Sequence, residues 1–141
     1  MRSDLIQAKS LLKEGGHTCV LCLDGDVLAS DERGVKPLLM FLESGADYSK
    51  YCAADRVVGK AAAFLYEKLC ITHVYAQTVS EAALEVFVRY GCEITYDVLV
   101  PRIKNRAGDG FCPMESAVRD IDCADDALRA ILETRRKMGL V

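Results

Sequence analysis

The chain has 141 residues, of which 51% are hydrophobic and 28% charged, and its formal net charge is −3 at pH 7. This size and composition are typical of one globular domain with a buried core, so we expect a single domain over residues 1–141. The negative charge argues against nucleic acid as the main partner, because neutralising phosphates requires a basic surface. No apolar run approaches the ~20 residues that cross a membrane, and the first residues become polar too early for a signal peptide.

Seven cysteines are spread along the chain, an odd number with no motif that pairs them. Without a secretory signal, we expect reduced thiols that pack as small hydrophobic side chains in a cytoplasmic protein. Cys19 and Cys22 have the C-x-x-C spacing, but residues three apart on a strand point to opposite faces of a sheet. We therefore expect no metal site and no cofactor.

Local signals predict helices and strands along the whole chain. Two apolar runs around Asp24-Gly25 favour a β-hairpin, Pro37 and Pro113 suit first turns of helices, and Asp122 can cap a terminal helix. The expected elements are a helix from residue 3 to the glycines at 15 and 16, a hairpin of 18–23 and 27–29, a helix from 37 to 45, a loop of 46–54, a central helix of 55–69, a strand of 71–76, a helix of 81–90, strands of 92–96 and 98–100, a turn-rich segment of 105–115 with a short helix from 113, and a helix from 122 to 137.

Alternation of strands and helices in the second half of the chain is typical of βαβ units with right-handed crossovers onto one sheet. We expect an α/β fold, a three-layer α/β/α sandwich with a mixed sheet of about five strands. The central helix of 55–69 is apolar on nearly every face, which predicts burial on most sides. Its first turn is polar, which predicts that the helix start opens into a pocket.

Gly59 and Lys60 are the first candidate site residues. They do not complete a P-loop, because positions 54 and 61 are both alanine. A glycine within a helix costs ~1 kcal/mol relative to alanine, so Gly59 indicates a close neighbour, either a packed strand or a ligand. Lys60 near a helix start opposes the helix dipole, which a bound anion or a partner carboxylate could offset. The alternative is an ordinary solvated lysine.

Ser80 and Glu81 mark a second helix start directly after a strand. In open α/β sheets such starts line the binding crevice, so the helix starts at 55 and 80 could face each other across one pocket. A capping box of Thr78 and Glu81 would explain the same residues without any ligand. Cys112 precedes Pro113 at a helix start, which can lower a thiol pKa, but neither histidine is tied to it by spacing, so a Cys-His nucleophile is the weaker interpretation.

Four segments carry a resemblance to a known fold. They are Arg33-Gly-Val-Lys-Pro-Leu-Leu39, Asp55-Arg-Val-Val-Gly-Lys-Ala61, Val79-Ser-Glu-Ala-Ala-Leu-Glu85, and residues 105–115 with their Cys-Pro-Met-Glu. With the order of the expected elements, they resemble the cytidine-deaminase-like fold, and within it a family of small bacterial and archaeal proteins of unassigned function.

The resemblance implies the fold without the zinc chemistry. Zinc deaminases carry H-x-E at the start of one helix and P-C-x-x-C at the start of the next. At these places this chain has Asp55-Arg-Val-Val-Gly-Lys60 and Thr78-Val-Ser-Glu-Ala-Ala83, with no histidine or cysteine in either. Hydrolytic deamination needs the metal to generate hydroxide near neutral pH, so the resemblance implies that this mechanism is lost.

Three hypotheses follow. The leading one is a non-zinc protein that binds a nucleotide or another phosphate-bearing small molecule. The second is a metal-independent enzyme that acts on a nucleotide-like substrate through Lys60, Asp55, Asp109 or Cys112. The third is a mainly structural protein that forms a homo-oligomer through its apolar hairpin or helices. The candidate ligand-binding residues are Lys36, Asp55, Gly59, Lys60, Ser80, Glu81, Asn105, Asp109, Cys112 and Glu115.

Overall fold

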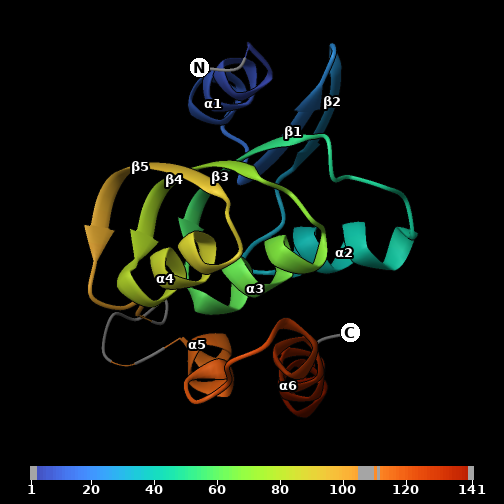
Figure 1. Cartoon of the computed structure of the whole chain (residues 1–141). Helices are drawn as coiled ribbons and strands as arrows, with labels where there is room; N and C mark the ends of the chain where they lie inside the picture. Colours follow the sequence, from blue (N-terminus) through green and yellow to red (C-terminus); the bar gives the residue numbers. More distant parts are fainter. Residues whose placement is uncertain (1–2, 105–109, 111, 140–141) are drawn as a thin grey trace.

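The computed structural model describes residues 3–104, 110 and 112–139. Within these residues six helices and five strands form a mixed α/β fold (Figure 1). In chain order they are α1 (Ser3–Gly15), β1 (Cys19–Leu23), β2 (Asp26–Ser30), α2 (Lys36–Ser44), β3 (Cys52–Val58), α3 (Lys60–Lys68), β4 (His73–Ser80), α4 (Glu81–Arg89), β5 (Glu93–Val100), α5 (Pro113–Val118) and α6 (Ala124–Lys137). None of these helices is long and apolar enough to cross a membrane.

The five strands form one sheet in the order β2-β1-β3-β4-β5. The hairpin of β1 and β2 is antiparallel, and β1 also pairs antiparallel with β3. The three strands β3, β4 and β5 are parallel and are joined by α3 and α4. The predicted hairpin, mixed sheet and helical crossovers are therefore confirmed.

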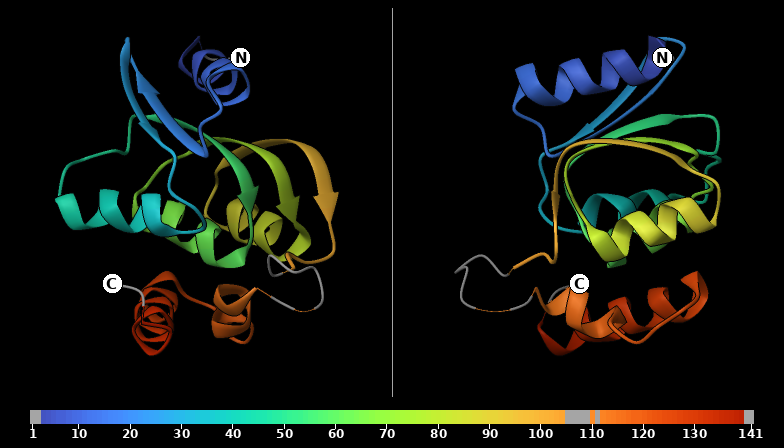
Figure 2. Two further views of the ribbon diagram at one scale, coloured as in Figure 1. Left: turned by 180° about the vertical axis from the view of Figure 1, so that it is seen from behind. Right: turned by 60° about the vertical axis from the view of Figure 1, so that its left-hand side comes forward.

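Helices cover both faces of the sheet, and a further helical layer lies outside (Figures 1 and 2). On one face α1 packs against β1 and β3, and on the other lie α2, α3 and α4. The pair α5 and α6 packs on α3, on the side away from the sheet. The three-layer expectation is thus incomplete, because the last two helices bury their apolar stripes against a helix and not against a strand.

The expected helix of 55–69 is wrong in its first part, which belongs to a strand. Residues 52–58 form β3, which pairs with β1 on one side and with β4 on the other. A strand between two others usually shows a continuous apolar run, but Asp55 and Arg56 interrupt the apolar residues of β3, so that signal was missing. The helix itself begins at Lys60, and every residue from Ala61 to Tyr66 is buried. The buried body of the helix is confirmed.

Other boundaries also differ from the expected ones. The segments 92–96 and 98–100 are parts of one strand, β5, and the sheet still has five strands because β3 was missed. Thr78 lies within β4, and Ser80 caps α4 by accepting a hydrogen bond of 3.1 Å from the Ala83 N–H, so the capping box is wrong. Cys123, and not Asp122, holds the N-cap position of α6.

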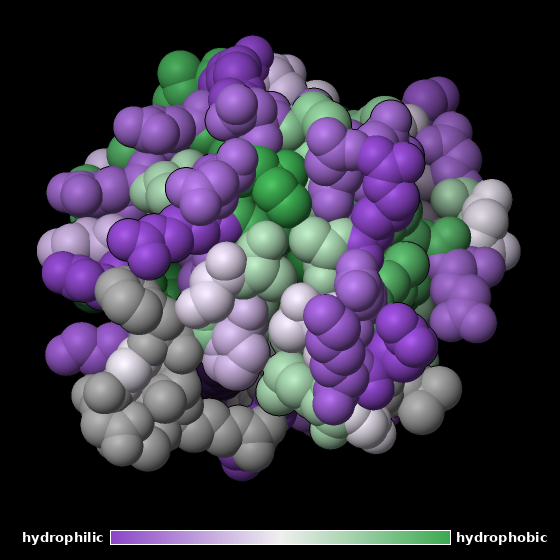
Figure 3. Space-filling view, turned by 90° about the horizontal axis from the view of Figure 1, so that it is seen from below, coloured by the Kyte–Doolittle hydropathy of each residue, from purple (hydrophilic) through white to green (hydrophobic). Residues whose placement is uncertain are grey.

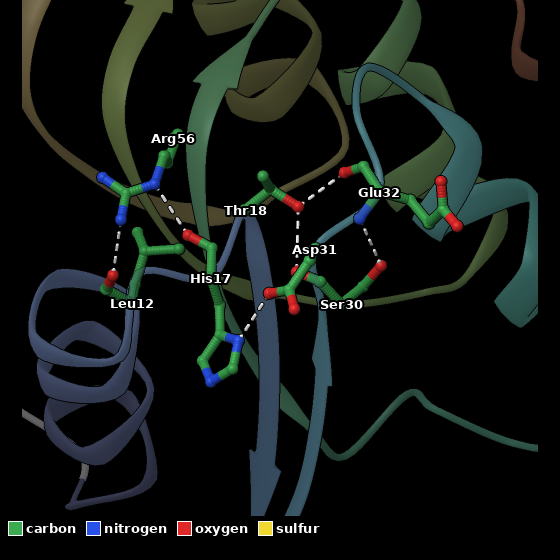
Figure 4. A network of polar contacts seen from close by, with 7 residues as sticks. All are labelled: Leu12, His17, Thr18, Ser30, Asp31, Glu32 and Arg56. Carbon is green, nitrogen blue, oxygen red and sulfur yellow. Dashed lines mark hydrogen bonds and ion pairs between the residues drawn. The ribbon is translucent and has the colours of Figure 1, made fainter.

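Arg56 joins α1 to the centre of the sheet (Figure 4). Its guanidinium donates to the carbonyl oxygens of His17 at 2.7 Å and Leu12 at 2.8 Å. It also donates to Gln77 Oε1 at 3.2 Å. Arginine thereby satisfies carbonyl groups at and just beyond the end of α1, where a helix leaves its last C=O groups without partners.

Candidate functional site

The carboxylate of Glu115, from α5, lies on the first turn of α3. Its Oε1 accepts a hydrogen bond of 2.7 Å from the Lys60 N–H, and its Oε2 accepts one of 2.9 Å from the Ala61 N–H. Gly59 makes room for this contact, because a Cβ on Gly59 would lie 2.3 Å from the Glu115 Cδ. Of the two neighbours that the sequence allowed at this helix start, an anion or a carboxylate of the chain, the structure contains the carboxylate.

Burial and hydrogen bonding act on Glu115 in opposite directions. Burial raises the pKa of its carboxyl group, while the N–H groups of Ala61 and Lys60 and the Lys60 charge lower it, and burial is the larger effect. The positive end of the α3 dipole supports the ionised form in the same way as the N–H groups do. The two N–H groups and the Lys60 charge thus offset part of the cost of burying the carboxylate.

A cleft of about 300 Å³ opens on one side of Glu115 and gathers three cationic side chains. We call it the cationic cleft, and its polar lining consists of Lys60, Ser80, Arg102, Glu115, Ser116 and Arg119. The three cations come from different elements, since Lys60 begins α3, Arg102 follows β5 and Arg119 follows α5. Among the described residues that line the cleft, the one carboxylate is that of Glu115, which the start of α3 already holds. The cleft therefore has the charge of an anion site.

Lys60 also has a structural contact. Its Nζ donates a hydrogen bond of 3.0 Å to the backbone oxygen of Arg119, and it lies 5.8 Å from the ring centre of Phe64. An ammonium group has three donors, so this contact leaves capacity for a ligand. The lysine is therefore held by one hydrogen bond to the backbone beyond α5.

On the other side of Glu115 lies a second cavity of about 270 Å³. We call it the acid cavity, and its polar lining includes Thr18, Arg33, Asp55, Cys112 and Glu115. Thr18 is held in place by the hairpin, because its hydroxyl lies 2.9 Å from the Ser30 carbonyl oxygen (Figure 4). Glu115 lines both hollows, and the acid cavity holds the cations Arg33 and Arg56 beside its two acids, Asp55 and Glu115.

Asp55 is the buried acid of this cavity. Only 7% of the residue is exposed, and its Oδ2 accepts a hydrogen bond of 2.7 Å from the Tyr66 hydroxyl. The same hydroxyl lies 3.6 Å from Cys19 Sγ. Burial raises the pKa of Asp55 to about 7, although Tyr66 and the N–H groups of Arg56 and Val57 act against that rise. Burial also raises the pKa of Cys19 well above its ordinary value, so this thiol is a core residue.

Most of the sequence candidates lie around Glu115, but not all do. Gly59 and Cys112 line the acid cavity with Asp55, and Lys60 and Ser80 line the cationic cleft. The two helix starts therefore share one cleft, with α3 starting at 60 and not at 55. Glu81 is exposed and lines neither hollow. Asn105 and Asp109 lie outside the described residues.

Lys36 belongs to a different part of the surface. It lines a groove of about 450 Å³ between α2 and α6, whose floor is apolar. Figure 3 looks onto the layer of α5 and α6 and shows a purple band of hydrophilic side chains with green apolar surface beside it. Lys36 also forms an ion pair of 3.4 Å with Glu32. Lys36 lines neither of the two hollows beside Glu115, so its role as a ligand-binding residue stays a prediction.

Sequence reasoning missed Arg102, Arg119 and Arg33. Arg102 stands directly after the Pro101 that ends a strand, and a polar residue after a strand end was the one signal available. Arg119 follows a helix of only six residues, so no local sequence signal indicated that its side chain faces the cleft. Among the described residues, no three histidine, cysteine, aspartate or glutamate side chains come together in a way that could hold a metal ion.

Comparison with known proteins places the chain in a family. The model of the family described as "Domain of unknown function (DUF1893)", TM1506, matches residues 7–134. A solved structure that matches is the crystal structure of a DUF1893 family protein (TM1506) from Thermotoga maritima, with 24% identity and a TM-score of 0.87. The match covers 94% of this chain and 91% of that one. None of the curated proteins matches this chain.

Proposed function

The chain belongs to the DUF1893 family, and we propose that it binds a phosphate-bearing small molecule, such as a nucleotide, in the cationic cleft. The observation that carries this proposal is the convergence of Lys60, Arg102 and Arg119 on one cleft of about 300 Å³. Charge-assisted hydrogen bonds from Arg and Lys are the strong contacts by which proteins hold phosphate. The hydroxyls of Ser80 and Ser116 add neutral donors to the same cleft.

The fold supports this location. The starts of α3 and α4 follow directly on the neighbouring parallel strands β3 and β4, and ligands of open α/β sheets bind outside the carboxyl ends of such strands. The same arrangement of helix starts is the basis on which we propose that the fold is cytidine-deaminase-like. With α3 capped by Glu115, however, the phosphate contacts come from side chains and not from the first N–H groups of α3.

The proposal is tested by thermal unfolding with inorganic phosphate, adenosine, and adenosine and guanosine mono- and triphosphates. A ligand at 100 times its dissociation constant adds ~2.7 kcal/mol of stability. We expect the phosphate-bearing compounds to raise the melting temperature of the wild type, adenosine not to, and Arg119→Ala and Lys60→Ala to weaken the effect. Lys36→Ala is the matched control, because this lysine lies on the other groove.

Two results would contradict the proposal. One is that no phosphate compound stabilises the wild type. The other is that Lys60→Ala and Lys36→Ala respond alike to every compound that does. Because surface charges are screened by salt, the titrations are compared at 50 and 300 mM salt, and binding that is independent of salt would also argue against a cationic anchor.

The acid cavity favours a second candidate function, metal-independent acid–base catalysis. A general acid or base works best with a pKa near the operating pH, and Asp55 has a pKa of about 7. It shares its cavity with Cys112 and Glu115. Once a bound compound is known, its turnover is followed by mass spectrometry. Turnover that Asp55→Asn abolishes while binding persists supports the candidate, and turnover unaffected by that change refutes it.

A further inference from the structure

β5 is an open edge of the sheet. It is the last strand in the order β2-β1-β3-β4-β5, and none of the described strands lies beyond it. In Figure 1 it forms the outer side of the molecule, next to β4. Such an edge presents a row of backbone N–H and C=O groups that can pair with another strand.

The strand lacks the features with which proteins usually protect an edge. Its sequence, Glu93-Ile-Thr-Tyr-Asp-Val-Leu-Val100, contains no lysine, arginine or proline over eight residues. Proteins commonly place these residues on edges, or shorten the strand, to prevent pairing. A strand of this length and composition is therefore suited to accept a partner strand.

The two acids of β5 are already paired within the chain. Asp97 Oδ2 accepts hydrogen bonds from Lys13 Nζ at 3.1 Å and from the Tyr75 hydroxyl at 2.6 Å. Glu93 Oε2 lies 3.1 Å from His73 Nε2. Because Asp97 and Glu93 contact side chains of α1 and β4, their charges do not prevent a partner strand from pairing with the β5 backbone.

Apolar side chains are exposed on both faces of this edge. Tyr96 and Leu99 are 40% and 42% exposed, although their register partners on β4, Ala76 and Val79, are buried core residues. Val98 is 48% exposed and pairs with Thr78, which in turn pairs with Val57 on β3. Val98 and Leu99 are neighbours on the strand and so point to opposite faces of the sheet. A partner strand would cover apolar surface on both faces at once.

The opposite edge differs. The strand β2 has five residues, and its Asp26 is bound by the Tyr51 hydroxyl from the loop before β3. Its large apolar residue Val27 is 37% exposed, less than any of the three on β5. The hairpin, where the sequence suggested pairing between chains, is thus the less suitable edge.

We infer that β5 pairs antiparallel with the β5 of a second copy of this chain, so that two sheets of five strands become one continuous sheet. A second copy fits because a two-fold axis brings identical edges together antiparallel, and each offers the same length and the same apolar side chains. With the two-fold axis at Tyr96, Asp97 of one strand lies opposite Thr95 of the other and Glu93 lies opposite Leu99, so like charges do not face each other.

Sedimentation equilibrium of the full chain tests this inference. We expect the wild type to have twice the 15.5 kDa chain mass, and the double variant Val98→Lys/Leu99→Lys to have the single mass with an unchanged circular dichroism spectrum. Val27→Lys, which puts the same charge on the other edge, is the matched control and should keep the double mass. A single mass for the wild type overturns the inference, as does a double mass for the β5 variant.

Hydrogen exchange on the wild type decides the question even if the double lysine variant fails to fold. In the paired protein the outward amides of β5 should exchange as slowly as those of the central strand β4, and dilution toward the single mass should release them. A protein of double mass whose β5 amides exchange fast pairs through another surface, and that result overturns the inference.

Discussion

Removing the Glu115 carboxylate should destabilise the fold by a predictable amount. Glu115→Ala leaves the N–H groups of Lys60 and Ala61 without the acceptor that now lies at 2.7 and 2.9 Å. Loss of an N-terminal cap costs about 0.5–2 kcal/mol. Because the site adjoins a cleft that water can enter, we expect about 1–2 kcal/mol. For a chain of 141 residues this lowers the melting temperature by roughly 3–8 °C.

The measurement is thermal unfolding near pH 7, with Glu133→Ala as the matched control. Glu133 is an exposed residue of α6 that forms an ion pair of 3.3 Å with Lys137, and its loss should cost about 0.5 kcal/mol or less. If Glu115→Ala and Glu133→Ala have the same melting temperature, Glu115 does not cap α3 and the description of the site is wrong.

A double variant sharpens this test. Gly59→Ala puts a methyl group where the Glu115 carboxylate lies, so it should break the same two hydrogen bonds. The backbone of Gly59, with φ −96°, is accessible to alanine, and the cost therefore comes from displacing the carboxylate. Changes that act through one contact are not additive. The double variant Gly59→Ala/Glu115→Ala should consequently be no less stable than Glu115→Ala, and additive losses would refute the shared contact.

Two further predictions concern residues behind the site. Asp55 has a pKa of about 7 in the folded chain, against an ordinary value of 3.8. The neutral carboxyl group therefore contributes stability in full below pH 3.8. This contribution, on the order of 4 kcal/mol, is lost as the pH rises to about 7. In urea denaturation, Asp55→Asn should therefore gain stability relative to wild type between pH 5 and 8, while the exposed control Asp120→Asn should not. Arg56→Ala loses three hydrogen bonds and should cost about 2–3 kcal/mol in the same assay; a loss below 0.5 kcal/mol would contradict its role.

Local signals in the sequence were sufficient for much of the fold. Asp24-Gly25 located the hairpin turn, Pro113 the short helix, and Gly45 the end of α2, because each of these depends on backbone angles that few residues adopt. The error at 55–59 has a physical cause. Ala53 and Ala54, expected in a loop, belong with residues 55–58 to one strand between two neighbouring strands, and Asp55 and Arg56 interrupt the apolar run that usually marks such a strand.

The candidate site was predictable only where its residues stand at helix starts. Gly59, Lys60 and Ser80 were found because a glycine, a cation and a capping residue have known effects at these positions. Glu115 was found as a candidate, but its contact with a helix start 54 residues earlier depends on how α5 packs on α3. Arg119 could not be found, since its position is fixed by that packing alone.

The position of Glu115 relates stability to anion binding. The sequence allowed either a bound anion or a carboxylate of the chain at this helix start, and the fold places there the carboxylate of Glu115, which lines the cleft together with three cations. Glu115→Ala removes a negative charge from the cationic cleft and releases two N–H donors toward it. The variant that loses stability should therefore bind phosphate compounds more tightly than wild type, because the helix start becomes available as an anion site. Weaker binding by Glu115→Ala would instead mean that the carboxylate positions Lys60 for the ligand.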